Sequence, residues 1–146
     1  MSNLLYDSLF GRHVGDDKPF LTFADGSQIS YGWFLCMASR FANTLRAAGL
    51  TAGDRLAVQV EKSAEALAIY AACVQSGVIF LPLNVAYKPA EVEYFISDSG
   101  ARMLIAGDEE HLQPVAAAHD VTLYHMAADG SGSFTSLAAE ASDQFT

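Results

Sequence analysis

The chain has 146 residues, of which 51% are hydrophobic and 17% charged, and its formal net charge is −9. This length corresponds to one domain, and the composition excludes a globally disordered chain. Only eight basic side chains stand against 17 acidic ones. Nucleic acid and anionic membrane surfaces are therefore excluded as partners, because too few cations are present to neutralise their phosphates.

The first elements of the sequence predict a small hairpin followed by a helix. Residues 19–23 and 28–30 are short β-prone runs, and the Asp-Gly pair between them tolerates the positive φ of a tight turn. Ser30 is a suitable cap for the helix that follows. Its apolar side chains recur at spacings of three and four up to Gly49, as they do on one face of a helix: Phe34, Ala38, Phe41, Leu45 and Ala48.

The rest of the chain alternates strands and helices. We expect strands at 55–60, 78–81, 102–105 and 121–124, and helices at 63–76, 89–99, 109–118 and 135–141. The run 78–81 shows no polar alternation, which predicts a strand buried on both faces. Strands separated by helices of 10 to 15 residues indicate βαβ units. The predicted fold class is therefore α/β, with a mostly parallel sheet flanked by helices on both faces and preceded by a short β-hairpin.

Several features bear on the cellular setting. The stretch 64–83 has one charge, Glu65, but Gly77 interrupts it, so a buried helix and strand explain it better than a membrane span. Cys36 and Cys73 both fall in predicted helices, and we expect two reduced core thiols of a cytoplasmic protein. The amino terminus lacks the pattern of a signal peptide.

Ligands of open α/β sheets bind beyond the carboxyl ends of the strands, so those junctions are the candidate sites. The first junction, residues 60–65, has no glycines whose amides could hold a pyrophosphate. Glu61 and Glu65 would repel a pyrophosphate there, and Lys62 is expected to be solvated. At the second, Asn84 and Tyr87 could line a pocket, although a turn residue and a half-buried aromatic explain them as well.

The third junction holds Asp108, Glu109 and Glu110. A divalent metal is conceivable there, but acids at a helix amino terminus are already favoured by the helix dipole. The histidines, His13, His111, His119 and His125, lack the spacing of a zinc site. The pair His119-Asp120 is better explained as a helix end than as an acid–base pair. We therefore predict no catalytic, cofactor-binding or metal-binding residues in this chain.

Four segments resemble, in order, the conserved blocks of the acyl-adenylate-forming (AMP-binding) enzymes: 28–31, 53–58, 73–84 and 89–102. The family's Ser/Thr/Gly-rich phosphate loop ending in Lys-Gly is absent. Within the family, segments 58–63, 81–87 and 129–134 are similar to those of malonyl-CoA synthetases. Two departures are Lys88, where a Thr-like cap is usual, and Trp33, which replaces the Glu of a capping box.

This resemblance implies that residues 1–146 are a single incomplete domain, the N-terminal subdomain of a larger enzyme. Members of the family activate a carboxylate with ATP and Mg²⁺ and pass the acyl group to CoA. The resemblance places the catalytic residues and the groups that recognise a malonate-like carboxylate outside this sequence. Alone, the chain is expected to be inactive, and to self-associate or pack on the remainder of the enzyme.

Two other hypotheses remain open. The chain could come from another adenylating enzyme, such as an aryl- or fatty-acyl-CoA ligase or an amino-acid-activating domain. It could also be a complete non-catalytic α/β binding module, which would require a self-sufficient sheet with protected edges.

Overall fold

Four parallel strands form the central sheet, in the order β4-β3-β5-β6. In the computed structural model, which describes residues 3–146, their bounds are β3 (Arg55–Gln59), β4 (Ile79–Pro82), β5 (Met103–Ala106) and β6 (Thr122–His125). The register aligns Leu56 of β3 with Phe80 of β4 and with Met103 of β5. The predicted parallel sheet is confirmed, with boundaries shifted by about one residue.

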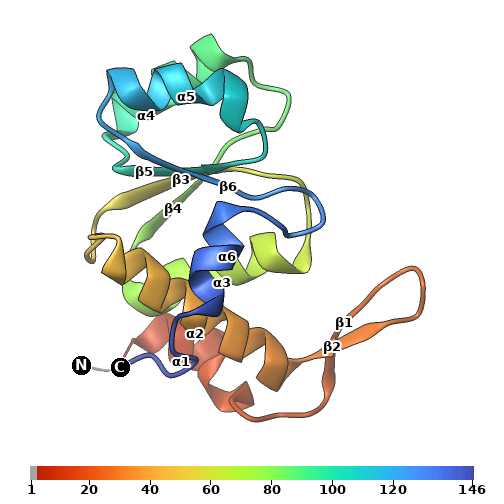
Figure 1. The fold of residues 1–146 in the computed structure, drawn as a ribbon. Coiled ribbons are helices and arrows are strands. Elements are labelled where there is room, and N and C mark those ends of the chain that lie inside the picture. Colours follow the sequence, from red (N-terminus) through yellow and green to blue (C-terminus); the bar gives the residue numbers. More distant parts are fainter. Residues whose placement is uncertain (1–2) are drawn as a thin grey trace.

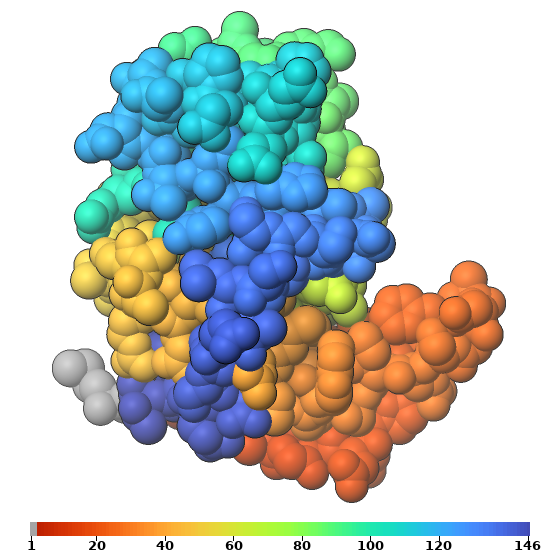
Figure 2. Space-filling model, in the orientation of Figure 1, coloured from red at the N-terminus to blue at the C-terminus, as the bar shows by residue number. Residues whose placement is uncertain are grey.

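Helices cover both faces of this sheet, as predicted (Figure 1). One face carries α4 (Pro89–Ser99) and α5 (Glu109–Ala118). The other carries α2 (Tyr31–Ala47), α3 (Ala64–Ser76) and α6 (Ser133–Ala139). The antiparallel hairpin of β1 (Pro19–Thr22) and β2 (Gln28–Ser30) projects from the body as an arm (Figures 1 and 2).

The helix boundaries follow local capping signals. Ser30 accepts a hydrogen bond from the Trp33 amide at 3.1 Å, and Ser63 accepts one from the Ala66 amide at 3.0 Å. α4 has no such hydroxyl. Instead the Glu91 carboxylate accepts from the Lys88 amide at 2.7 Å, which satisfies a donor that the helix itself leaves unpaired. α3 ends at Gly77 with φ of +78°, a conformation that glycine adopts without a Cβ penalty.

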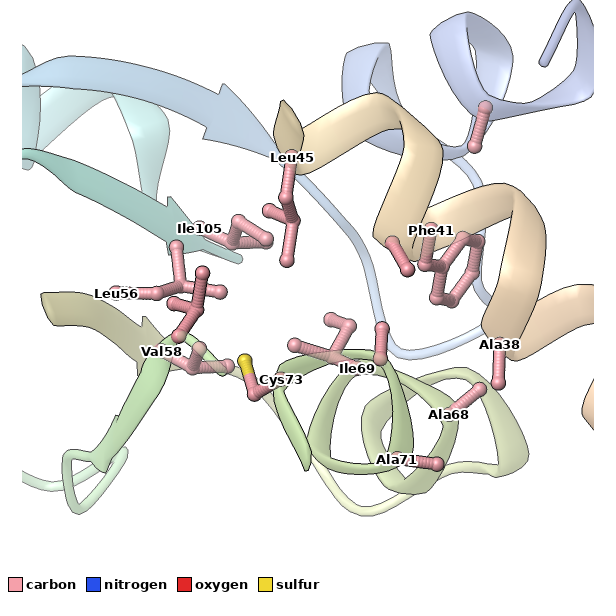
Figure 3. Close-up of a cluster of buried hydrophobic side chains, with 14 of the residues drawn as sticks. Ala38, Phe41, Leu45, Leu56, Val58, Ala68, Ile69, Ala71, Cys73 and Ile105 are labelled. Atoms are coloured by element: carbon pink, nitrogen blue, oxygen red, sulfur yellow. The ribbon is translucent and has the colours of Figure 1, made fainter. Parts of the chain in front are cut away.

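The sheet separates two hydrophobic cores. Leu56 and Val58 of β3 point into the core beneath α2 and α3, whereas Ala57 between them points toward α4 and α5. Figure 3 shows the larger core, where side chains of α2, α3 and the sheet converge. This alternation is what a strand covered on both faces requires.

Three expectations need correction. β4 is an edge strand with Ile79 47% exposed, so it is not buried on both faces; the apolar run alone does not reveal strand order. Cys36 is exposed and only Cys73 is buried, because Cys36 faces away from the apolar side of α2. The predicted helix at 63–76 is apolar nearly all round, which predicts an exposed apolar patch that includes Leu67, Tyr70 or Val74. Leu67 is exposed, but Tyr70 and Val74 are half-buried, and Tyr70 packs edge-on against Phe80.

The amino-terminal segment adds structure that the sequence did not predict. α1 (Leu4–Leu9) and a 3₁₀ turn at Gly11–His13 precede the hairpin. Asn3 caps α1 by accepting from the Tyr6 amide at 3.0 Å, and Phe10 reaches the main core. Within residues 3–146, no helix is long and apolar enough to cross a membrane.

Candidate functional site

The carboxyl ends of β3, β5 and β6 meet at one edge of the sheet, as parallel strands must. A cavity of about 320 Å³ lies there. It is lined by Gln59, Val60, Glu61, Val85, Gly107, Asp108, Met126, Ala127 and Ala128. The structure thus brings the three predicted junctions together around one hollow.

Gln59, the last residue of β3, organises this edge although the sequence reasoning did not single it out. Its side chain is 6% exposed. Its amide nitrogen donates to the carbonyl oxygens of Asn84 at 2.8 Å and Tyr87 at 3.1 Å. With both bonds made by the nitrogen, the group that Gln59 can offer to the cavity is its carbonyl oxygen, an acceptor.

Gln59 therefore holds the loop after β4 through the backbone carbonyls of Asn84 and Tyr87. The side chains of these two residues make other contacts. The Asn84 side chain accepts from the Ala86 amide at 2.9 Å, which makes it the polar residue of a turn. The Tyr87 ring stacks on Phe95 of α4, with centroids 5.2 Å apart. Neither side chain lines the cavity at the sheet edge, although Tyr87 lines a separate, shallower hollow beside α4.

Carboxylates dominate the charge at the cavity. Asp108 caps α5 by accepting from the His111 amide at 3.3 Å, and its carboxylate contacts the His111 ring at 2.9 Å. This hydrogen bond lowers the pKa of Asp108 and raises the pKa of His111. Glu61 is the second acid of the lining, while Lys62 is exposed and not part of it. Two carboxylates and an amide oxygen are all hydrogen-bond acceptors, so this cavity suits a ligand that donates hydrogen bonds rather than a phosphate group.

The amino terminus of α3, where a βαβ unit could bind phosphate, is already occupied. Ser63 caps it, and Glu65 of its first turn lies against Gly130. A Cβ built on Gly130 would come within 2.6 Å of the Glu65 carboxyl carbon. The residues present therefore do not fit the triphosphate of ATP, and no phosphoryl-transfer step can be assigned to them.

Three of the four histidines weighed from the sequence each contact a different carboxylate. His13 contacts Asp16 at 3.2 Å and His111 contacts Asp108. His119 contacts Glu93 of α4 at 3.0 Å, so the neighbouring Asp120 is not its partner. Across residues 3–146, no group of three or more His, Cys, Asp or Glu side chains is placed to hold a metal ion.

The loop after β6 is a second feature that the sequence reasoning described only as a turn. Asp129 accepts from the amide and the hydroxyl of Ser131, at 2.9 and 2.6 Å. Gly132 has φ of +140°, and a Cβ there would collide with the carbonyl oxygen of His125. The signal available in the sequence was the paired glycines, whose positions here require the absence of a side chain.

An open parallel sheet with helices on both faces places the chain in the α/β class. The AMP-binding enzyme family model matches residues 11–145. The chain therefore belongs to the AMP-binding enzyme family.

Solved structures and curated proteins give the same relationship. Apo MatB from Rhodopseudomonas palustris is 38% identical with a TM-score of 0.92, over 100% of this chain and 30% of that chain. ATP-bound MatB from that organism is 39% identical with a TM-score of 0.92, over 99% of this chain and 29% of that one.

Curated relatives are similarly much longer than this chain. Feruloyl-CoA synthase of an Amycolatopsis species is 38% identical over 63% of this chain and 18% of its own length. Surfactin synthase subunit 2 of Bacillus subtilis is 30% identical over 96% of this chain and 4% of its own length.

Proposed function

We propose that this chain is the N-terminal scaffold portion of an ATP-dependent, cytoplasmic malonyl-CoA synthetase. That enzyme would convert malonate, ATP and CoA into malonyl-CoA, AMP and pyrophosphate through an acyl-adenylate. The observation that carries the proposal is the likeness to MatB along the whole chain, at 38% identity and a TM-score of 0.92. The resemblance of segments 58–63 and 81–87 to malonyl-CoA synthetases supports the same substrate.

In this proposal, residues 1–146 are one incomplete domain that forms part of the enzyme's scaffold and carries none of its catalytic residues. A carboxylate oxygen attacks the α-phosphate of ATP and pyrophosphate leaves; the CoA thiol then attacks the acyl carbon and AMP leaves. Mg²⁺ would supply charge neutralisation at the phosphates. Such steps need cationic clamps, whereas the candidate cavity of this chain presents Glu61 and Asp108. The phosphate-binding residues therefore belong to parts of the enzyme beyond this sequence.

The edge strand β4 supports a role as part of a larger body. Its outer edge pairs with no strand among residues 3–146, and Ile79 on it is 47% exposed. Strands of parallel sheets are ordinarily covered, and an open apolar edge promotes association. We propose that the remainder of the enzyme covers β4, and that the 146-residue chain alone self-associates through it.

Titration calorimetry with Mg·ATP and a malonate-dependent pyrophosphate-exchange assay test this proposal. The 146-residue chain should bind ATP weakly and show no exchange above background. A longer parent chain containing it should show exchange with malonate, and in that chain Glu61→Gln and Lys62→Met should leave exchange unchanged. Micromolar ATP binding by the 146-residue chain, or exchange by it, would contradict the scaffold role.

Of the two alternatives, the first has observations in its favour. The likeness to feruloyl-CoA synthase and to surfactin synthase supports another adenylating enzyme, an aryl-CoA ligase or an amino-acid-activating domain. Exchange by the parent chain with ferulate or an amino acid, and not with malonate, would favour that assignment. A non-catalytic α/β module would be favoured if the 146-residue chain stayed monomeric at high concentration and bound no hydrophobic dye.

A further inference from the structure

The cavity at the carboxyl edge of the sheet is lined by a buried side chain with an unused hydrogen-bond acceptor. Gln59 is 6% exposed, and its side-chain nitrogen lies 2.8 and 3.1 Å from two backbone carbonyl oxygens. Exchanging the two ends of the amide would set its oxygen against those carbonyls, so the orientation is fixed. The side-chain oxygen, Oε1, then takes part in no hydrogen bond among residues 3–146.

This oxygen is open to the cavity. Among the buried and half-buried side chains of residues 3–146, every nitrogen or oxygen closed off from solvent has a hydrogen-bond partner. Because Oε1 of Gln59 has none, it keeps contact with solvent, and Gln59 lines the hollow of about 320 Å³. Buried polar groups in proteins are ordinarily hydrogen-bonded. A donor placed in this cavity can therefore satisfy Oε1.

The charge around the cavity is negative. Asp108 lines it, and the His111 amide and ring use only part of the acceptor capacity of its carboxylate. Glu61 adds a second, exposed carboxylate. The described residues of the lining include no basic side chain. ATP, CoA and a malonate-like acid are all anions, so none of the substrates of the proposed reaction suits this cavity.

The remaining walls are largely apolar. Val60, Val85, Met126 and Ala127 line the cavity beside these acceptors. An occupant therefore needs an apolar stem for these walls and a donor head for Oε1 and the carboxylate. Lysine and arginine side chains have this construction, as do small aliphatic amines and guanidines. A charged donor also forms a stronger hydrogen bond with a carboxylate than a neutral donor does.

We propose that this cavity binds an alkylammonium or alkylguanidinium group, which donates hydrogen bonds to Oε1 of Gln59 and to the carboxylate of Asp108. Two sources carry this chemistry: a lysine or arginine side chain of the same enzyme, and a free small molecule. The site lies outside the proposed reaction, because its charge suits none of the substrates.

The natural full-length enzyme that contains residues 1–146 is the protein to test, and Asp108→Asn is the first variant. Asparagine keeps the oxygen that caps α5, since Asn and Asp are equally good amino-terminal caps, but it removes the charge from the cavity. Calorimetry with n-butylammonium and n-butylguanidinium detects binding of a free ligand. The wild type should bind one of these probes about tenfold more tightly than Asp108→Asn does, as expected for one charge-assisted hydrogen bond.

A side chain of the same enzyme would block both probes in the wild type, and chemical labelling then identifies it. Reductive methylation labels lysines, phenylglyoxal labels arginines, and mass spectrometry locates each label. One native lysine or arginine that is protected in the wild type should be labelled about tenfold faster in Asp108→Asn, by the same estimate for one charge-assisted hydrogen bond.

Ala128→Lys tests the same site without changing α5. Ala128 lines the cavity, so the new ammonium competes for its acceptors and should weaken probe binding, or unmask the same native side chain, as Asp108→Asn does. The control is Ala118→Lys, which adds the same charge at an exposed position of α5 outside the lining and should behave as the wild type.

The proposal is overturned if neither Asp108→Asn nor Ala128→Lys changes probe binding or the labelling of a native lysine or arginine. It is also overturned if Ala118→Lys has the same effect as those two variants, because that result reflects overall charge. Pyrophosphate exchange is not the readout, so the outcome is independent of whether the proposed function holds.

Discussion

The side-chain amide of Gln59 donates to the carbonyl oxygen of Asn84 at 2.8 Å, across a separation of 25 residues. This bond ties the end of a central strand to the loop that follows the edge strand. A buried amide with satisfied donors fixes geometry, since the alternative is an unpaired polar group. The candidate cavity at this edge of the sheet thus has a wall set by one side chain.

We predict that Gln59→Leu destabilises the fold by about 1–3 kcal/mol. The Tyr87 carbonyl loses the Gln59 donor, and the Asn84 carbonyl loses one of two donors and keeps the Tyr87 amide. Urea denaturation measures the change in free energy of unfolding. Gln113→Leu, at an exposed position of α5, should change it by no more than about 0.5 kcal/mol. Equal effects of the two substitutions would show that the Gln59 bonds do not stabilise the fold.

Gly132→Ala should be more damaging than its size suggests. Its φ is +140°, and a Cβ would collide with the His125 carbonyl, which is backbone and cannot rotate away. We expect a loss of about 3 kcal/mol from strain and overpacking together. Gly26→Ala is the matched control, with φ of +85° and open space around it, and should cost about 1 kcal/mol. Thermal unfolding of both variants checks the difference.

We expect Asp54 to make the free energy of unfolding depend on pH in the acidic range. Its carboxylate accepts from the Thr51 amide at 2.7 Å, from the Thr51 hydroxyl at 3.0 Å and from Arg102 at 3.0 Å. These bonds, the Thr51 amide first, lower the pKa of Asp54 below its ordinary value of 3.8. A lowered pKa gives stability that is complete above the unfolded-state value and disappears as pH falls through the folded-state value.

The free energy of unfolding lost in Asp54→Asn should therefore be constant at neutral pH and shrink as the pH falls below about 4. Denaturation of both proteins across that range measures it. An NMR titration in which the Asp54 carboxyl titrates at or above its ordinary value would contradict the assignment.

The two cysteines should differ in reactivity. Burial raises the pKa of the Cys73 thiol to about 12, and the thiolate is the reactive form. Cys36 is exposed. A disulfide reagent at pH 8 should titrate one thiol in the folded protein and two after denaturation. Folded Cys36→Ser should show none; a fast-reacting thiol in that variant would show that Cys73 is accessible.

Local signals were sufficient to predict most elements. Ser30 and Ser63 begin helices because their hydroxyls satisfy amide donors nearby, and Gly77 ends one because of its backbone freedom. Cys36 could also have been placed correctly, because it lies two positions after Phe34 and so falls off that residue's helix face. The short α1 gave too few residues for any periodicity to emerge.

Long-range relationships were not available in the same way. The apolar run of β4 is compatible with both a central and an edge strand. Strand order depends on pairing between distant segments, so a local sequence pattern does not reveal it. Gln59 can be recognised in the sequence as one polar residue inside an apolar strand. A buried polar side chain predicts a hydrogen-bond partner, but the sequence pattern does not identify that partner. Arg40 and Asn43 fall off the apolar face of their helix, which periodicity can predict, but their hydrogen-bond partners lie about one hundred residues further along the chain, which periodicity cannot predict.

The alternation of the central strands has a consequence for how the chain can misfold. A slip of one residue in β3 would send Leu56 and Val58 toward α4 and α5, where Ala57 now fits, and leave Ala57 facing Ile69. Both faces of the strand are apolar, so hydrophobicity alone cannot reject the slipped pairing. Side-chain volume can, because one layer would be overfilled while the other held a void. The volumes of the side chains on the two faces of β3 therefore select its correct register.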